Sequence, residues 1–219
     1  MNCNQHSRIN TAQFQCLIGS SIRFAMLIVL TIAIVFAPSF VVAGSKGSVY
    51  KEQQLQVAFV YNFLKFTDWP SESFTDQSGK DSTGPSPIVV AIVGKTTFDC
   101  ADKTIKGKII NGRVIELRQI SVNDIVSARA AAFLSDCHAL FIGSDEKVEA
   151  GRALAHIKRK GLLTIGCEPG FLEDGGIINF IFEANKMRFE INMVAARESS
   201  LKVRSKLLRL AKRVIQDND

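Results

Sequence analysis

Few residues of this sequence have the chemistry that catalysis needs. Beyond residue 43 the cysteines are Cys100, Cys137 and Cys167, and the histidines are His138 and His156. Cys137 and His138 are adjacent, but neighbours on a strand point to opposite faces, which disfavours a catalytic pair. The sequence also contains no metal-ligand spacing, no P-loop and no GxSxG motif. These observations predict a protein that is not an enzyme and that uses no metal or cofactor.

A strip of polar residues interrupts an otherwise apolar helix in the stretch AFVYNFLKFTDWP, residues 58–70. Asn62, Lys65 and Trp69 are spaced at i, i+3 and i+7, so they share one face of a helix. One interpretation is structural: Asn62 bonds the nearby backbone, and Lys65 extends its ammonium group to water along an apolar stem. The other is a rim that contacts a partner or a small ligand, because tryptophan is favoured at interface hot spots. The sequence leaves both interpretations open.

Asn179, Arg188 and Glu190 form a second candidate surface, in a predicted hairpin. The segments 178–183 and 187–192 alternate apolar and polar residues around a turn near Asn185. A tight turn there would place the three side chains on one face. They could form an Arg–Glu pair beside an amide. If that face lines a cleft instead, Arg188 could anchor an anionic small-molecule effector.

The elements that must position these residues follow from hydrophobic periodicity. The first helix, Glu52–Asp68, is apolar on two sides, so we expect both sides to be covered, and Pro70 ends it. Apolar runs then alternate with helical segments, which predicts a single α/β domain. Its sheet is mostly parallel, is flanked by helices on both faces and carries an appended antiparallel hairpin. The expected strands are 88–93, 114–120, 138–143 and 162–165, and the expected helices are 97–105, 123–134, 146–159, 194–198 and 206–216.

The first 43 residues have the composition of a secretory signal peptide. Arg8 and Arg23 are their only charges, an apolar run spans 24–36, and small residues precede the expected cleavage after Ala43. An uncleaved anchor is the alternative, but the run is shorter than the roughly 20 residues that a membrane span needs. Cleavage removes two of the 27 basic residues and none of the 21 acidic ones, which leaves a net charge of +4. That charge is too mild for nucleic-acid binding, and we expect a soluble periplasmic protein.

Three segments of the chain form a long and idiosyncratic pattern. They are VAFVYNFLKFTDWP, CHALFIGSDE and the terminal block LLTIGCEPGFLEDGGIINFIFEANKMRFEINMVAARESSLKVRSKLLRLAKRV. In the terminal block, GGxINFxxE, RFEINxxAA and a leucine-rich basic segment follow one another. This order resembles the YfiR family of exported bacterial proteins, and the likeness defines a domain over residues 50–216.

The resemblance implies a regulatory role. The namesake of the family is a periplasmic repressor that binds the periplasmic domain of an inner-membrane diguanylate cyclase, and an outer-membrane lipoprotein can sequester it. The implied fold is a compact α/β domain, commonly a homodimer, which a small-molecule effector could also control. The family is broader than its namesake, so the alternative is a small-ligand-binding accessory protein for a sensor kinase or a transporter.

The resemblance also implies a structural disulfide, for which Cys100 and Cys137 are the candidates. Cys100 follows the first buried strand and Cys137 precedes the next buried strand of the same type, so neighbouring strands would bring them close. Closing this loop would stabilise the fold by roughly 4 kcal/mol on the chain-entropy model. Two buried thiols are the alternative. The odd count leaves Cys167, which could pair between chains.

Overall fold

The computed structural model describes residues 46–74, 85–144, 154, 157, 159–184 and 186–216. The expected signal peptide, residues 1–43, lies outside the described residues, as does most of the helix expected at 146–159. Residues 45–219 belong to one compact unit. Within the described part of the chain, no helix is both long enough and apolar enough to cross a membrane.

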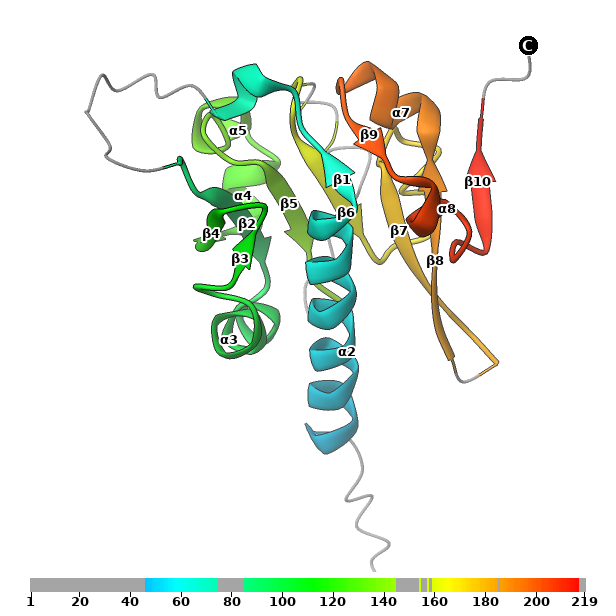
Figure 1. The fold of residues 1–219 in the computed structure, drawn as a ribbon. Helices are drawn as coiled ribbons and strands as arrows, with labels where there is room; N and C mark the ends of the chain where they lie inside the picture. The colour runs from blue at the N-terminus through cyan, green and yellow to red at the C-terminus, as the bar shows by residue number, and fades with distance from the viewer. Residues whose placement is uncertain are drawn as a thin grey trace, which may run out of the picture. The chain divides into compact units, whose positions relative to one another are not determined.

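Among the described residues, one sheet holds eight strands, shown in Figure 1. They are β2 (Ile88–Val93), β3 (Ile109–Ile110), β4 (Arg113–Ile120), β5 (Ala139–Ile142), β6 (Leu163–Gly166), β7 (Ile178–Glu183), β8 (Lys186–Asn192) and β10 (Arg213–Ile215). Their order across the sheet is β10-β8-β7-β6-β5-β2-β4-β3. The neighbours from β4 to β7 are parallel, and β8 returns antiparallel to β7 as the hairpin. The predicted fold class is confirmed.

The central strand β2 is buried along its whole length because the chain covers both faces of the sheet. Its side chains alternate between two apolar clusters: Val90 and Ile92 belong to the first, and Val89, Ala91 and Val93 to the second. Helices α2 (Lys46–Lys65) and α3 (Lys95–Thr104) contribute to the first cluster, and α4 (Val122–Ile125) and α5 (Ala130–Phe133) to the second. A strand covered on both faces reads as a continuous apolar run, as this one does.

Both apolar sides of helix α2 are covered, as expected, but the second side is covered only in part. Val60 and Leu64 are buried in the first cluster. On the other side Phe63 is fully buried and Phe59 and Phe66 are half-buried, whereas Leu55 is 47% exposed. Apolar side chains on the second side of α2 are therefore open to a further contact.

Helix α2 also ends earlier than predicted, at Lys65 instead of Asp68. The next residues form β1 (Thr67–Asp68), which pairs antiparallel with β9 (Lys202–Val203) in a small separate sheet. Asp68 accepts a hydrogen bond from Nη2 of Arg204 at 2.6 Å. A strand partner from the far end of the chain therefore takes over the residues that would have continued the helix.

The prediction of a terminal helix at 206–216 is wrong. The chain forms one helical turn, α8 (Ser205–Leu208), and then β10, which lies parallel to β8. Strand β8 would otherwise present unpaired backbone groups at the edge of the sheet, and the Lys212 N–H donates to the Phe189 oxygen at 2.9 Å. Arg213 adds ion pairs to Glu190 and Glu173. These long-range partners outweigh the helical periodicity of the segment.

The helix predicted at 123–134 is two single turns, α4 and α5. Ser121 and Asp124 form a capping box that begins α4. The helix predicted at 194–198 is found as α7 (Met193–Glu198), and a 3-10 turn, η1 (Ser71–Phe74), follows β1.

Candidate functional site

The three residues of the predicted α2 strip do not stay together. The Asn62 side chain donates to the Ala58 oxygen at 3.2 Å within the helix, and Lys65 is exposed. Trp69 lies beyond the end of the helix and turns inward, where its Nε1 donates to the His138 oxygen at 3.1 Å. Its ring meets that of Phe74 edge to face, with centroids 6.4 Å apart. Trp69 thus has a structural role, whereas Asn62 and Lys65 remain on the surface.

His138 is the centre of the contacts around Trp69. Its Nδ1 accepts from the Val89 N–H at 3.1 Å, and its Nε2 lies 2.9 Å from the Ser73 oxygen, to which it donates. The ring stacks on Phe74 with a centroid distance of 4.5 Å. Burial lowers the pKa of His138 to about 4, and the positive charges of Arg159 and Arg113 act in the same direction. Both ring nitrogens are therefore engaged with the backbone, and the imidazole is neutral at physiological pH.

Arg113 completes this cluster from β4. Its guanidinium lies 3.7 Å from the ring centroid of Phe74, and its Nη1 donates to the Ser86 oxygen at 2.7 Å. The Ser86 hydroxyl in turn donates to the Phe74 oxygen at 3.0 Å. The result is a clasp, formed by Trp69, Phe74, Arg113 and His138, that ties η1 to the sheet.

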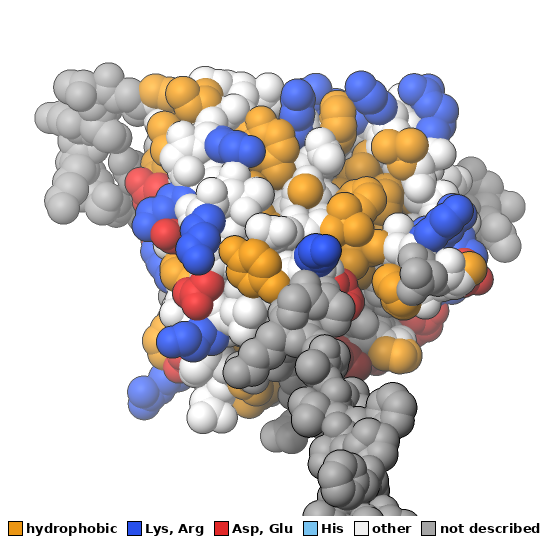
Figure 2. All heavy atoms as spheres, turned by 90° about the horizontal axis from the view of Figure 1, so that it is seen from below, with side chains coloured by type: hydrophobic (Ala, Val, Ile, Leu, Met, Phe, Trp, Pro, Cys, Tyr) orange, Lys and Arg blue, Asp and Glu red, His pale blue; other side chains and the backbone are white. Residues whose placement is uncertain are grey.

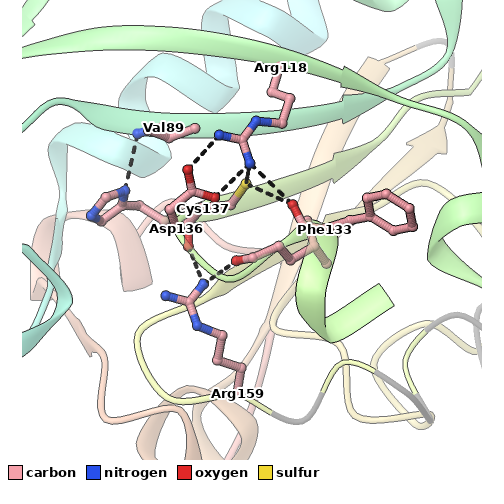
Figure 3. A network of polar contacts seen from close by, with 8 residues as sticks. Val89, Arg118, Phe133, Asp136, Cys137 and Arg159 are labelled. Atoms are coloured by element: carbon pink, nitrogen blue, oxygen red, sulfur yellow. Dashed lines mark hydrogen bonds and ion pairs between the residues drawn. The ribbon is translucent and has the colours of Figure 1, made fainter. Parts of the chain in front are cut away.

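Arg118 and Arg159 hold the turn that leads into β5, as Figure 3 shows. Arg118 donates to both carboxylate oxygens of Asp136, at 2.6 and 2.5 Å. Arg159 donates to two carbonyl oxygens of the turn, one of them that of Cys137 at 2.6 Å. Burial raises the pKa of the Cys137 thiol to about 11, so the thiol stays protonated at neutral pH. Neither the Cys137 thiol nor the His138 imidazole has a pKa suited to acid–base or nucleophilic catalysis at neutral pH.

The predicted disulfide between Cys100 and Cys137 is not formed in this structure. Cys100 lies on α3 in the first cluster, and Cys137 lies in the second. The sheet separates the two clusters, and no bond joins the two sulfurs. Cys100 also follows the carboxyl end of β2, whereas Cys137 precedes the amino end of β5, which runs parallel to β2.

The three residues of the predicted hairpin surface lie on one face of the hairpin, and Asn179 is buried there. Asn179 lies directly opposite Glu190, and Arg188 lies opposite Ile181, two residues nearer the turn. Glu190 forms its ion pair with Arg213 of β10, at 2.8 Å. Because Phe180 and Phe189 face α2, the alternation of the strands places Asn179 and Glu190 on the opposite face. The two candidate surfaces are therefore not one site.

A polar cluster that the sequence analysis missed lies at the carboxyl ends of β5 and β6. Gln56 donates to Cys167 Sγ at 3.5 Å and accepts from the Ser144 hydroxyl at 3.4 Å. One turn earlier, Gln53 is fully buried, and its amide has no hydrogen-bond partner in the described part of the chain. Two glutamines three residues apart on the buried stripe of α2 are the signal that could have revealed it. In open α/β sheets, ligands bind beyond the carboxyl ends of the strands.

The fold and the site place the chain in the class of single α/β domains with a mostly parallel sheet. Buried polar side chains fix the turns that connect its strands. A family model described as YfiR/HmsC-like matches residues 53–212. The chain belongs to the YfiR/HmsC-like family.

No curated protein matches the sequence. Two solved structures are similar over 74% of this chain. One is an ABC domain in complex with L-Trp from Streptococcus pneumonia, with 14% identity and a TM-score of 0.44. The other is a conserved domain protein from Vibrio cholerae O1 biovar eltor, with 10% identity and a TM-score of 0.48. The chain spans 60% of the length of each, and likenesses this low carry no argument about function.

Proposed function

We propose that the protein is an exported periplasmic regulator. It binds and inhibits the periplasmic domain of an inner-membrane signalling enzyme, a diguanylate cyclase, and so controls cyclic-di-GMP and biofilm formation. The observation that carries this proposal is membership of the YfiR/HmsC-like family over residues 53–212. An outer-membrane lipoprotein that sequesters the regulator, and a homodimeric state, belong to the same proposal.

The environments of Cys137 and His138 support a function by binding rather than by catalysis. The thiol of Cys137 and the imidazole of His138 are both buried, and their pKa values are shifted toward the neutral forms. A regulator of this kind works by population shift. It must bind the inactive conformation of the cyclase more tightly than the active one, since equal affinity for both would shift nothing.

Deletion of the gene tests the direction of the effect. We expect cyclic-di-GMP to rise in the deletion strain and to return to its original level when the full-length gene is restored. The purified protein, with its leader removed, should also capture the periplasmic domain of a cyclase from the same cells in a direct binding assay. Unchanged cyclic-di-GMP together with no captured cyclase domain would rule the proposal out.

The second candidate function is a small-ligand-binding accessory protein for a sensor kinase or a transporter. The observation in its favour is Gln53, a buried amide without a partner in the described part of the chain, near the carboxyl ends of the strands. A hollow of about 520 Å³ also lies at the ends of β2 and β4, between Gly94 and Ser121. A metabolite that raises the melting temperature of the wild type, but not that of Gln53→Leu, would favour this candidate.

A further inference from the structure

We infer that the partly exposed edge of α2, together with the adjacent face of the β7–β8 hairpin, is the surface that docks on the partner domain. The partner surface that fits it is apolar at its centre and acidic at its rim. This inference rests on the proposed function and adds to it the place and the chemistry of the contact. It does not involve the clasp around His138.

The centre of the surface is an outer strip of apolar side chains, defined as Leu55 and Phe59 of α2, Phe66 directly after it, and Phe182 and Met187 of the hairpin. Phe59 rests on Phe180 and Phe189, with ring centroids 6.0 and 5.8 Å apart. Phe182 and Met187 are paired across the hairpin, one step nearer its tip on the same face. Leu55 is one helical turn from Phe59 in the same direction. The strip is therefore continuous from the helix onto the hairpin.

The strip is more open than a core face should be. Leu55 is 47% exposed and Phe182 is 63% exposed, although both continue the surface on which Phe59 packs. Contiguous exposed apolar side chains bordered by charged groups are typical of protein interaction sites. From Leu55 to Phe66, one residue past the end of α2, the chain rises about 16 Å. That length suits the centre of an interface that buries about 800 Å² on each partner.

Lysines lie on both flanks of α2, and Lys206, Lys51 and Lys65 are the ones on or beside the strip. Lys206 lies 5.1 Å from the ring centroid of Phe66. Lys108 and Lys103 lie 5.0 and 6.0 Å from the ring centroids of Tyr61 and Tyr50, on the opposite flank of the helix. Lys51 and Lys65 are exposed on α2 itself. Among the described residues, no carboxylate forms an ion pair with any of the five. Figure 2 shows hydrophobic side chains on the face it views, with basic side chains, and some acidic ones, around them.

This charge pattern indicates which kind of partner binds the strip. In a symmetric pair of identical chains the same lysines would face one another, because both copies present the same patch. Like charges brought together in this way cost affinity, whereas carboxylates on a different partner would gain it. An anionic bilayer also matches the charge, but Phe59 and Phe66 are half-buried against the core. Such rings can be covered by another protein but cannot insert into lipid as an interfacial helix does.

Three variants in a strain that lacks the chromosomal gene test the inference. Leu55→Asp and Phe182→Asp place a carboxylate at the centre of the strip. Ile109→Asp is the matched control, because Ile109 is also 63% exposed but lies on β3, at the far edge of the sheet. The readouts are cyclic-di-GMP, the amount of regulator by immunoblot, and the affinity of each purified protein for the captured cyclase domain.

We expect the wild type and Ile109→Asp to restore low cyclic-di-GMP, and both strip variants to leave it raised at equal protein amounts. The affinity of the strip variants should fall roughly thirtyfold, as expected for a hot-spot residue. If deletion raises cyclic-di-GMP but the strip variants restore it fully, the docking surface is wrong while the proposed function stands. If deletion has no effect, the proposed function itself fails.

Two further measurements address the other occupants of the strip. One is co-sedimentation of the purified wild type with phosphatidylglycerol vesicles, and the other is its mass in solution by light scattering. We expect Leu55→Asp to leave both unchanged. Loss of vesicle binding in this variant would assign the strip to the membrane, and loss of a dimer would assign it to a second copy. Either result would overturn the inference.

Discussion

His138 illustrates how a residue type suited to acid–base chemistry serves the fold instead. Its two ring nitrogens bond backbone groups of Val89 and Ser73, which are far from each other in sequence. Its own carbonyl oxygen accepts from Trp69 and from the Leu163 N–H at 2.9 Å. One residue thus joins the start of β2, the turn η1 and the start of β6. Protonation of the ring would place a hydrogen on Nδ1, so that two N–H donors, those of Nδ1 and Val89, would face each other.

We therefore predict that the free energy of unfolding decreases as the pH falls from about 6.5 to about 4. The folded protein holds His138 neutral, with a pKa of about 4, whereas the unfolded chain takes up a proton near pH 6.5. Because the unfolded state binds more protons in this window, the contribution is fully present above pH 6.5 and is lost as the pH falls. At about 1.4 kcal/mol per pKa unit, the loss amounts to roughly 3 kcal/mol at most.

Urea unfolding at several pH values across this window measures the effect. His138→Gln is the matched variant, because its amide can still bond the backbone but does not titrate. It should be less stable than the wild type near pH 7 and should lose much of the pH dependence between 6.5 and 4. Equal slopes for the two proteins in this window would contradict the prediction.

At the scale of elements, the glycines of the terminal block have a packing reason. A Cβ added to Gly166, at the end of β6, or to Gly176, just before β7, would meet the ring of Phe171 closer than 3.0 Å. The side chain of Phe171 is itself fully buried in the second cluster. The ring therefore packs directly on the backbone at both positions, and the GG pattern used above to recognise the family encodes this contact.

We predict that Gly176→Ala lowers the free energy of unfolding by about 2–3 kcal/mol, because the new methyl group overpacks the Phe171 site. Gly175→Ala is the neighbouring control: its φ is +94°, but a Cβ there meets nothing within 4 Å. That variant should lose only the cost of the left-handed backbone, about 1–2 kcal/mol. Denaturant unfolding of the two variants compares them directly. A larger loss in Gly175→Ala would show that backbone strain, not packing, governs this turn.

Elements were predictable from sequence where local pattern and tertiary environment agree. The run Ile88–Val93 matches β2 to the residue, because a strand buried on both faces has a pattern that no exposed segment shares. The helix predicted at 206–216 is wrong because the leucines and basic residues have helical spacing, whereas the backbone of β10 pairs with β8. A short segment cannot reveal that a distant strand needs a partner.

For the whole molecule, the limit of sequence reasoning is separation along the chain. Trp69 was singled out correctly as unusual, but its partner His138 lies 69 positions away, so the sequence could not decide between a core contact and a surface. Gln53 was not predicted because glutamines are ordinary on the exposed face of a helix, and its complete burial follows only from the packing of α2. The parallel sheet was predictable from alternating elements, whereas the face on which each side chain lies required the three-dimensional arrangement.

The cysteines test that arrangement as a whole, because the sheet lies between Cys100 and Cys137. We predict that dithiothreitol does not lower the melting temperature of the protein through this pair. A disulfide that closed the loop would contribute roughly 4 kcal/mol, and its reduction would lower the melting temperature by about 8–16 °C in a domain of this size. The comparison is between the wild type and Cys137→Ala, each melted with and without the reductant. A fall in the wild type that Cys137→Ala abolishes would mean that the two segments lie on the same face of the sheet, and that the arrangement of α3 and β5 described above is incorrect.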